Sequence, residues 1–212
     1  MKRLAVVFAL TAVVLFSANQ ASLAQQKHNQ SNHPSKVDSS HAHHQSKEMS
    51  GATTKTEIKS MPITDPKAAA SMNGIIDSYL KIKNSLAGDK SKSAADAGKE
   101  MVEAMDKMDK ALLNAEQAKL YQDVEDDARE HAEHIGANAG NIKHQREHFE
   151  LLSKDIYDLA KAFGGGRQLY KDFCPMYNDK KGVMWLSETK SIKNPYYGKS
   201  MPNCGSVQEE LK

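Results

Sequence analysis

Two cysteines and two methionines near the C-terminal end of the chain could bind a soft metal ion. The cysteines are the only two in the sequence, Cys174 in "DFCPMYN" and Cys204 in "SMPNCG". Met176 follows the first cysteine by two residues, and Met201 precedes the second by three. Two thiolates and two thioethers form a donor set that selects Cu(I) or a similar ion over Mg²⁺ or Ca²⁺. These four residues are therefore one candidate metal site, with Met184 as a secondary ligand.

A disulfide is the other interpretation of the same two cysteines. A Cys174–Cys204 bond would close a loop of about 30 residues, and on the chain-entropy model it would stabilise the fold by roughly 3–4 kcal/mol. The residue types leave both interpretations open. Because only reduced thiols bind a metal, the disulfide and the metal site could also be two redox states of one site.

Four histidines in the middle of the chain form a second candidate metal site. His131 and His134 are three residues apart, and His144 and His148 are four apart, so each pair can share one face of a helix. A helical hairpin with its tip near Ala139-Gly140 would bring the two pairs together. Imidazole is a ligand for Zn, Cu or Ni. The alternative is a polar helix end with solvated histidines.

The N-terminus predicts export. Residues 1–24 begin with Lys2 and Arg3, continue with an apolar run over residues 4–16, and end in a small-residue cleavage pattern typical of a secretory signal peptide. The run is too short to be a good transmembrane span. We therefore expect a periplasmic protein with no membrane insertion after the signal peptide is cleaved.

A polar tail is expected between the signal peptide and the folded domain. Residues 25–64 hold no aromatic side chain and too little apolar surface to offset chain entropy, so we predict that they are disordered. His41, His43 and His44 could capture a divalent metal loosely, or they could simply be solvated. The whole chain has 29 basic and 27 acidic side chains, a balance that does not suggest a nucleic-acid partner.

The remaining residues, 65–212, are enough for one domain. Apolar side chains recur at helical spacing in four segments, and short connections between such segments favour an antiparallel bundle. Asp65-Pro66 is a typical helix start, and Asn141 is a plausible N-cap for the last segment. The predicted helices run from 66 to about 87, from about 92 to 112, from about 115 to 138, and from about 141 to 163.

The pattern changes after the three glycines at 164–166. "LYKDFCPM" and "GVMWLS" are typical of two short strands joined by a turn-rich link, and they predict a hairpin within a cap over about 167–212. A single hairpin is marginal alone, so this cap must pack on the helices. The expected fold is mainly α, an antiparallel four-helix bundle over about 65–163 with a small C-terminal β-hairpin or loop cap.

The motifs of the cap resemble those of a known family. Cys-Pro-Met, Trp-Leu-Ser, Ile-x-Asn-Pro-Tyr-Tyr-Gly and Cys-Gly within residues 169–207 are similar to the signature of a bacterial exported family, domain of unknown function three-three-four-seven. "DSYLKIKNSLAGD" and "NIKHQREHFELLSKDIYDLAKAFG" resemble its helical part. Members occur alone or fused to periplasmic adaptors of copper and silver efflux pumps. Members often have a histidine where this chain has Phe173, so a ligand could be missing.

The resemblance implies an extracytoplasmic helical domain linked to heavy-metal handling, and no enzymatic activity is established for the family. The sequence itself has no Glu-x-x-His pair, haem attachment motif or phosphate loop, so we expect no enzyme. The expected function is binding of Cu(I) or a similar soft ion, and either buffering it or delivering it to a periplasmic efflux adaptor. The alternative is a disulfide-stapled, metal-free interaction module of the cell envelope.

Overall fold

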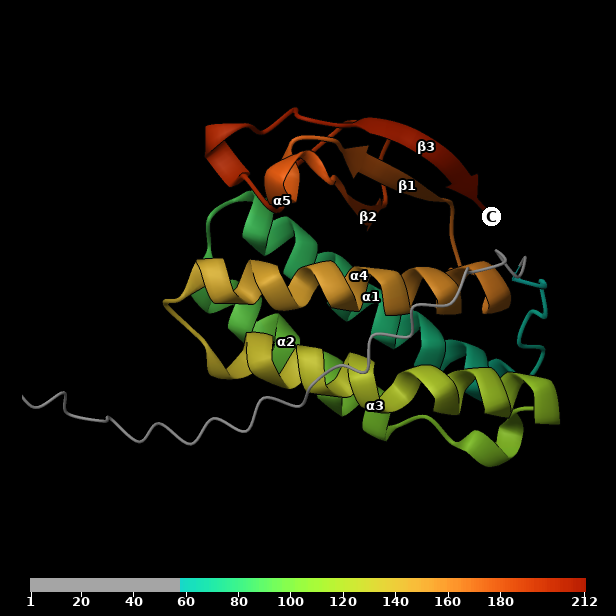
Figure 1. Ribbon diagram of the computed structural model, residues 1–212. Coiled ribbons are helices and arrows are strands. Elements are labelled where there is room, and N and C mark those ends of the chain that lie inside the picture. The colour runs from blue at the N-terminus through green and yellow to red at the C-terminus, as the bar shows by residue number, and fades with distance from the viewer. Residues whose placement is uncertain (1–57) are drawn as a thin grey trace, which may run out of the picture. The chain divides into compact units, whose positions relative to one another are not determined.

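The computed structural model describes residues 58–212 (Figure 1). The predicted signal peptide and most of the predicted tail, with His41, His43 and His44, lie outside these residues. Between Ile58 and Lys212, no helix is both long enough and apolar enough to cross a membrane.

The chain is mainly helical, as the sequence predicts. Each of four long helices packs against the next along the chain, and the first and fourth also contact each other. The fourth helix leads into a small sheet. This sheet lies over the first and fourth helices, on the side away from the second and third (Figure 1). The helices are α1 (Pro66–Ala87), α2 (Ser91–Asp106), α3 (Ala115–Ala137) and α4 (Ile142–Phe163).

Local side-chain contacts set the helix ends. The Asp65 carboxylate accepts hydrogen bonds from two backbone N–H groups of the first turn of α1. Asn114 and Gln117 form a reciprocal capping box at the start of α3, and the Asn141 side chain caps α4. Each cap satisfies a donor that the helix itself leaves free. At the other end of α4, Gly164 adopts a φ of +85° and stops the helix.

The second helix is shorter than predicted. It ends at Asp106, and a separate 3₁₀ turn follows at Lys110–Leu112, where the Asp109 side chain accepts a hydrogen bond from the Ala111 N–H. The apolar spacing continues past the helix end because Met108 is buried in the core without being helical. Periodicity alone therefore predicted a helix that runs six residues too far.

The segment before α1 is part of the folded domain, contrary to the expected tail boundary. Met61 donates its backbone N–H to Ala162 in α4, and Gln117 donates to the carbonyls of Met61 and Pro62. Ile58, Met61 and Ile63 pack against the core, so residues 58–64 hold enough apolar surface to dock.

The cap is a three-stranded antiparallel sheet and not a single hairpin. Its strands are β1 (Leu169–Cys174), β2 (Val183–Ser187) and β3 (Ser206–Leu211), in the order β2-β1-β3. The sequence predicted the hairpin of β1 and β2. It did not predict β3, because "SVQEEL" is an edge strand whose alternate residues Ser206, Gln208 and Glu210 are exposed and polar.

Tyrosine hydroxyls hold the outer edge of β2 against the helices. The Leu186 N–H donates to the Tyr79 hydroxyl at 3.0 Å, and the Tyr196 hydroxyl donates to the Met184 carbonyl at 2.9 Å. The Tyr79 hydroxyl lies 2.9 Å from Ser153 Oγ on α4. Without these bonds, the Leu186 N–H and the Met184 carbonyl would be buried without partners. The bonds therefore position the sheet.

The Asn-Pro-Tyr-Tyr-Gly motif anchors the loop between β2 and β3. The Asn194 side chain accepts from the backbone N–H groups of Tyr196 and Tyr197, and its amide donates to the Cys204 carbonyl at 2.8 Å. Gly198 has a φ of +53° and lies so close to Asp89 that a Cβ would overlap the carboxylate. The motif therefore has a structural role in this chain.

A buried charge cluster lies between α1 and the sheet. Lys83 Nζ pairs with Glu188 Oε2 at 2.7 Å, and the Asn84 amide donates to the other oxygen of that carboxylate at 2.8 Å. Asp172 is fully buried, and neither of its oxygens has a hydrogen-bond partner among the residues that the structure describes. Burial raises the pKa of Asp172 to about 7, although Lys83 and the nearby Trp185 side chain act in the opposite direction.

We expect Asp172→Asn to stabilise the protein at pH 8. A carboxyl whose pKa is raised in the folded state binds its proton more tightly there than in the unfolded chain, so its contribution to stability falls as pH rises from about 4 to about 7. Asparagine removes that penalty. The free energy of unfolding in urea should increase by roughly 1–3 kcal/mol at pH 8 and change much less at pH 4.5.

Glu188→Gln is the matched control, because it removes the carboxylate that pairs with Lys83. It should lower the free energy of unfolding at pH 8. An Asp172→Asn protein that is less stable than the parent at pH 8 would show that the Asp172 carboxylate is compensated in the folded state.

Candidate metal centre

The hairpin of α3 and α4 places four histidines at one end of the helical layer. The connection covers residues 138–141, and the helices run antiparallel from it. The buried Gln145 amide donates to the carbonyls of Ser91 and Ile135, each at 3.0 Å, and so fixes α4 against α3 near the tip. This register sets which side chains of the two helices face each other.

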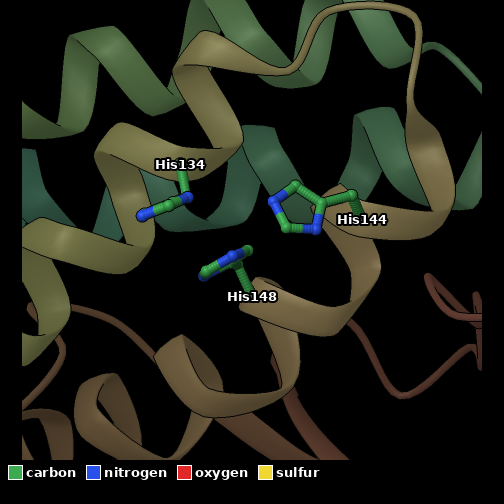
Figure 2. Close-up of side chains that lie close together, drawn as sticks. All are labelled: His134, His144 and His148. Carbon is green, nitrogen blue, oxygen red and sulfur yellow. The ribbon is translucent and has the colours of Figure 1, made fainter. Parts of the chain in front are cut away.

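Three of the histidines gather in one group. His134 on α3 and His144 and His148 on α4 point toward one another (Figure 2). Each offers one ring nitrogen, and these three atoms all lie within 4.8 Å of one another. Nitrogens bound to one tetrahedral Zn²⁺ are about 3.3 Å apart, given bond lengths near 2.0–2.1 Å. Small side-chain rotations would therefore bring the three nitrogens onto one ion.

Neighbouring groups occupy the second nitrogen of two of these rings. His148 Nδ1 lies 3.2 Å from His131 Nδ1, and His144 Nδ1 lies 3.3 Å from Glu147 Oε2. A ring whose Nδ1–H donates to such a neighbour is held in one orientation and keeps its Nε2 lone pair for a metal. Glu147 can only accept from His144, whereas in the His131–His148 pair either ring can be the donor. The arrangement resembles the outer contacts of metal-binding histidines in general.

The electrostatics favour a neutral His148. Burial, followed by the neighbouring imidazoles of His134, His144 and His131, lowers the pKa of His148 to about 4. Burial also lowers the pKa of His131. A neutral imidazole is the form that binds a metal, so the His148 ring is ready to act as a ligand at neutral pH.

The two cysteines form a disulfide. Cys174 at the end of β1 is bonded to Cys204 in the loop before β3, with the Cα atoms 5.7 Å apart. The disulfide is one of the two alternatives that the sequence left open. It removes both thiolates, so the soft-metal site of the cysteines with Met176 and Met201 is not formed in this state. For the reduced protein that site stays a prediction.

The predicted thioether ligands lie at the surface or in the sheet. Met176 and Met201 are 46% and 38% exposed, and Met184 is half-buried opposite Phe173 in the β1–β2 register. Met176 lines an open groove of about 860 Å³, together with Glu147 and other residues from α4 and from the link between β1 and β2. The link includes the short element α5 (Tyr177–Lys180), in which Asn178, Asp179 and Lys180 adopt a left-handed backbone conformation.

The sequence placed all four histidines at the hairpin tip, and the structure brings them together there. What the sequence did not indicate is the division of roles, in which three rings converge and His131 contacts only His148 among them by hydrogen bond. The i, i+3 and i, i+4 spacings put each pair on one face, but the rotation of each ring depends on packing that the spacing does not contain.

A mainly helical domain with a surface cluster of imidazoles and a disulfide-linked cap is thus the class that the fold and the site define. Comparison with known families agrees with the resemblance seen in the sequence. Residues 75–168 match the model of the family described as protein of unknown function (DUF3347). No curated protein and no solved structure matches the chain.

The matched range runs from within α1 to the residue before β1. It contains the four histidines and excludes both cysteines. The disulfide itself is typical of proteins in oxidising, exported compartments.

We expect Cys174→Ser to lower the free energy of unfolding of the oxidised protein by roughly 3–4 kcal/mol, because the bond closes a loop of about 30 residues. Met176→Leu should change it by less than about 0.5 kcal/mol, since that side chain is half exposed and keeps its volume. Chemical denaturation with and without a reductant measures both effects. Equal stability of the oxidised parent and Cys174→Ser would show that the bond contributes nothing.

Proposed function

We propose that this chain is an exported, non-enzymatic metal-handling domain that binds a transition-metal ion through His134, His144 and His148. One observation carries the proposal, the convergence of three imidazole nitrogens within 4.8 Å of one another on two rigid helices. Imidazole ligands suit Zn²⁺, Cu²⁺ and Ni²⁺. In this proposal α1–α4 form an antiparallel four-helix bundle, which holds the three imidazole rings in place near the tip of the α3–α4 hairpin.

The surroundings of the site favour a cation. Glu130, Glu133 and Glu147 lie on the same two helices, and two of these carboxylates are within 4 Å of a histidine ring nitrogen. Negative side chains near a surface site raise the local concentration of cations. The rings are partly exposed, so an ion can enter and leave. These features fit buffering or transfer of metal better than a structural metal.

The histidine site favours a different class of metal from the one that the sulfur donors alone would suggest. Histidine nitrogens are borderline ligands, whereas the cysteine and methionine set would select Cu(I). In this proposal the imidazole site works in the oxidised protein, and the sulfur set contributes only after Cys174–Cys204 is reduced. The family resemblance implies that the partner that receives the ion is a periplasmic efflux adaptor.

A second candidate function is a metal-free interaction module of the cell envelope. The disulfide favours it, because a stapled cap gives a rigid surface without any ion. The groove beside Met176 and the half-exposed Leu151 give that surface some apolar area for contact with a partner. The two functions differ in one measurable property, since only the metal-handling domain binds an ion at the histidines.

Titration calorimetry of the oxidised protein with Zn²⁺, Ni²⁺ and Cu²⁺ tests the proposal. We expect one tight ion per domain. His148→Ala should weaken binding by more than the 10–100-fold that is typical when only an outer contact is lost, because it removes a ligand. His134→Ala should have a similar effect, since the two rings serve the same ion.

The matched control replaces His41, His43 and His44 with alanine in the otherwise complete mature chain. This variant should lose weak sites and keep the tight one. Should His148→Ala bind as tightly as the parent while the tail variant loses the tight ion, the metal belongs to the tail and the second candidate function applies to the domain.

A further inference from the structure

The histidine site offers three protein donors and not four. Among residues 58–212, the histidine, cysteine and acidic side chains whose donor atoms lie close enough to share an ion form a single group, His134, His144 and His148. Structural zinc sites are closed by four protein ligands, whereas sites with three protein ligands keep a position for another molecule. The number of donors is therefore the first sign of an open site.

His131 is the nearest candidate for a fourth ligand, but its position argues for another role. Its Nδ1 faces His148 Nδ1 at 3.2 Å, a hydrogen-bond distance. When His148 Nδ1 donates the hydrogen in this contact, the lone pair of His148 is on Nε2, and that nitrogen is the one left for an ion. His131 is therefore a positioning residue, which orients His148 from behind.

The nearby carboxylates contact the rings but are not part of the group of converging donor atoms. Glu147 Oε2 lies 3.3 Å from His144 Nδ1, and its other oxygen is 3.9 Å from the Lys143 ammonium. Glu130 Oε1 is 3.9 Å from His134 Nε2. Glu147 is thus at hydrogen-bond distance from the His144 ring, whereas Glu130 is near the His134 ring without a hydrogen bond. Neither carboxylate joins the three nitrogens that converge.

The open side of the site faces solvent. The side chains of His134 and His144 are 45% and 34% exposed, and the three rings lie on the outside of the α3–α4 hairpin, whose core-facing residues are Ile135 and Phe149. A donor atom from another molecule can therefore reach an ion in this site without any opening of the fold.

We propose that an ion held by His134, His144 and His148 keeps one exchangeable coordination position, and that an imidazole nitrogen of another protein fills it. The inference rests on the proposed function and deepens it. Three imidazoles select borderline ions, which accept a fourth nitrogen readily. A histidine side chain on a partner could then take over the ion one ligand at a time, with a shared four-nitrogen intermediate and no free ion released.

Cobalt(II) provides the test, because its visible absorption reports its ligands. The oxidised full mature protein, with His41, His43 and His44 replaced by alanine, is loaded with one Co²⁺. It is then titrated with free imidazole and with a blocked Gly-His-Gly peptide. A blocked Gly-Ala-Gly peptide is the matched control. We expect a saturable spectral change with the first two ligands and none with the third, while the Co²⁺ content after gel filtration stays at one.

The outcomes distinguish the open coordination position from metal binding by the histidines. Tight Co²⁺ binding that depends on His148, with no response to either imidazole source, would overturn the open position and leave the proposed function standing. Co²⁺ binding that is unchanged in His148→Ala would overturn the proposed function itself. A response to free imidazole but not to the histidine peptide would overturn a protein side chain as the fourth donor.

His131→Phe tests the positioning role. The variant should keep the Co²⁺ spectrum and the imidazole response, and its Co²⁺ affinity should fall by about 10–100-fold, as is typical when an outer contact is lost. If His131 were the fourth ligand, the parent would show no imidazole response and the variant would gain one. His131→Asn, which keeps a hydrogen-bonding group, should recover part of the affinity, an outcome that a purely steric role would not produce.

Discussion

The hydroxyl of Tyr79 joins the helices to the C-terminal sheet, and the rest of the cap depends on this contact. It accepts the Leu186 N–H from the edge of β2 and lies 2.9 Å from Ser153 Oγ on α4, so one buried atom connects α1, α4 and the sheet. Burial raises the pKa of Tyr79 far above its usual value, which keeps this hydroxyl neutral. Without it, an edge-strand N–H would be buried unpaired, at a cost of about 1–3 kcal/mol.

The cap motifs follow from that constraint. Tyr79 and Tyr196 hold the edge of β2. Because Tyr196 belongs to the loop after β2, that loop must return to this edge, and the Asn194 side chain sets its turn. The returning loop carries Cys204 to the end of β1, where the disulfide closes. Motifs that resemble the family signature in sequence therefore serve the docking of the sheet in this chain. The clustered histidines lie instead on the helices, within the range that matches the family.

The sequence contains the signals for the helices but only part of the cap and the site. Asp65, Asn141 and the glycines after residue 163 mark helix ends through local chemistry, so they could be recognised without the structure. Strand β3 could not, because a polar edge strand has no distinctive periodicity. The sequence named a Cys174–Cys204 disulfide as one of two alternatives but could not choose between them, since the same two residues suit a metal. The loop path that brings Cys204 to Cys174 includes a hydrogen bond from the Asn194 amide to the Cys204 carbonyl, a contact that the spacing of the cysteines does not indicate.

The histidine cluster and the cap meet at one turn of α4. The His148 ring lies against those of His134 and His144. The next residue, Phe149, stacks on Tyr79 with ring centroids 5.1 Å apart and also contacts Tyr196. The cap tyrosines therefore hold the backbone that positions His148, while Gln145 fixes the same turn against α3. Three imidazoles can converge at the surface without a metal because the turn that carries two of them is held by buried aromatic contacts. Rings held in this way would lose little freedom on binding an ion, which is the advantage of a preorganised site.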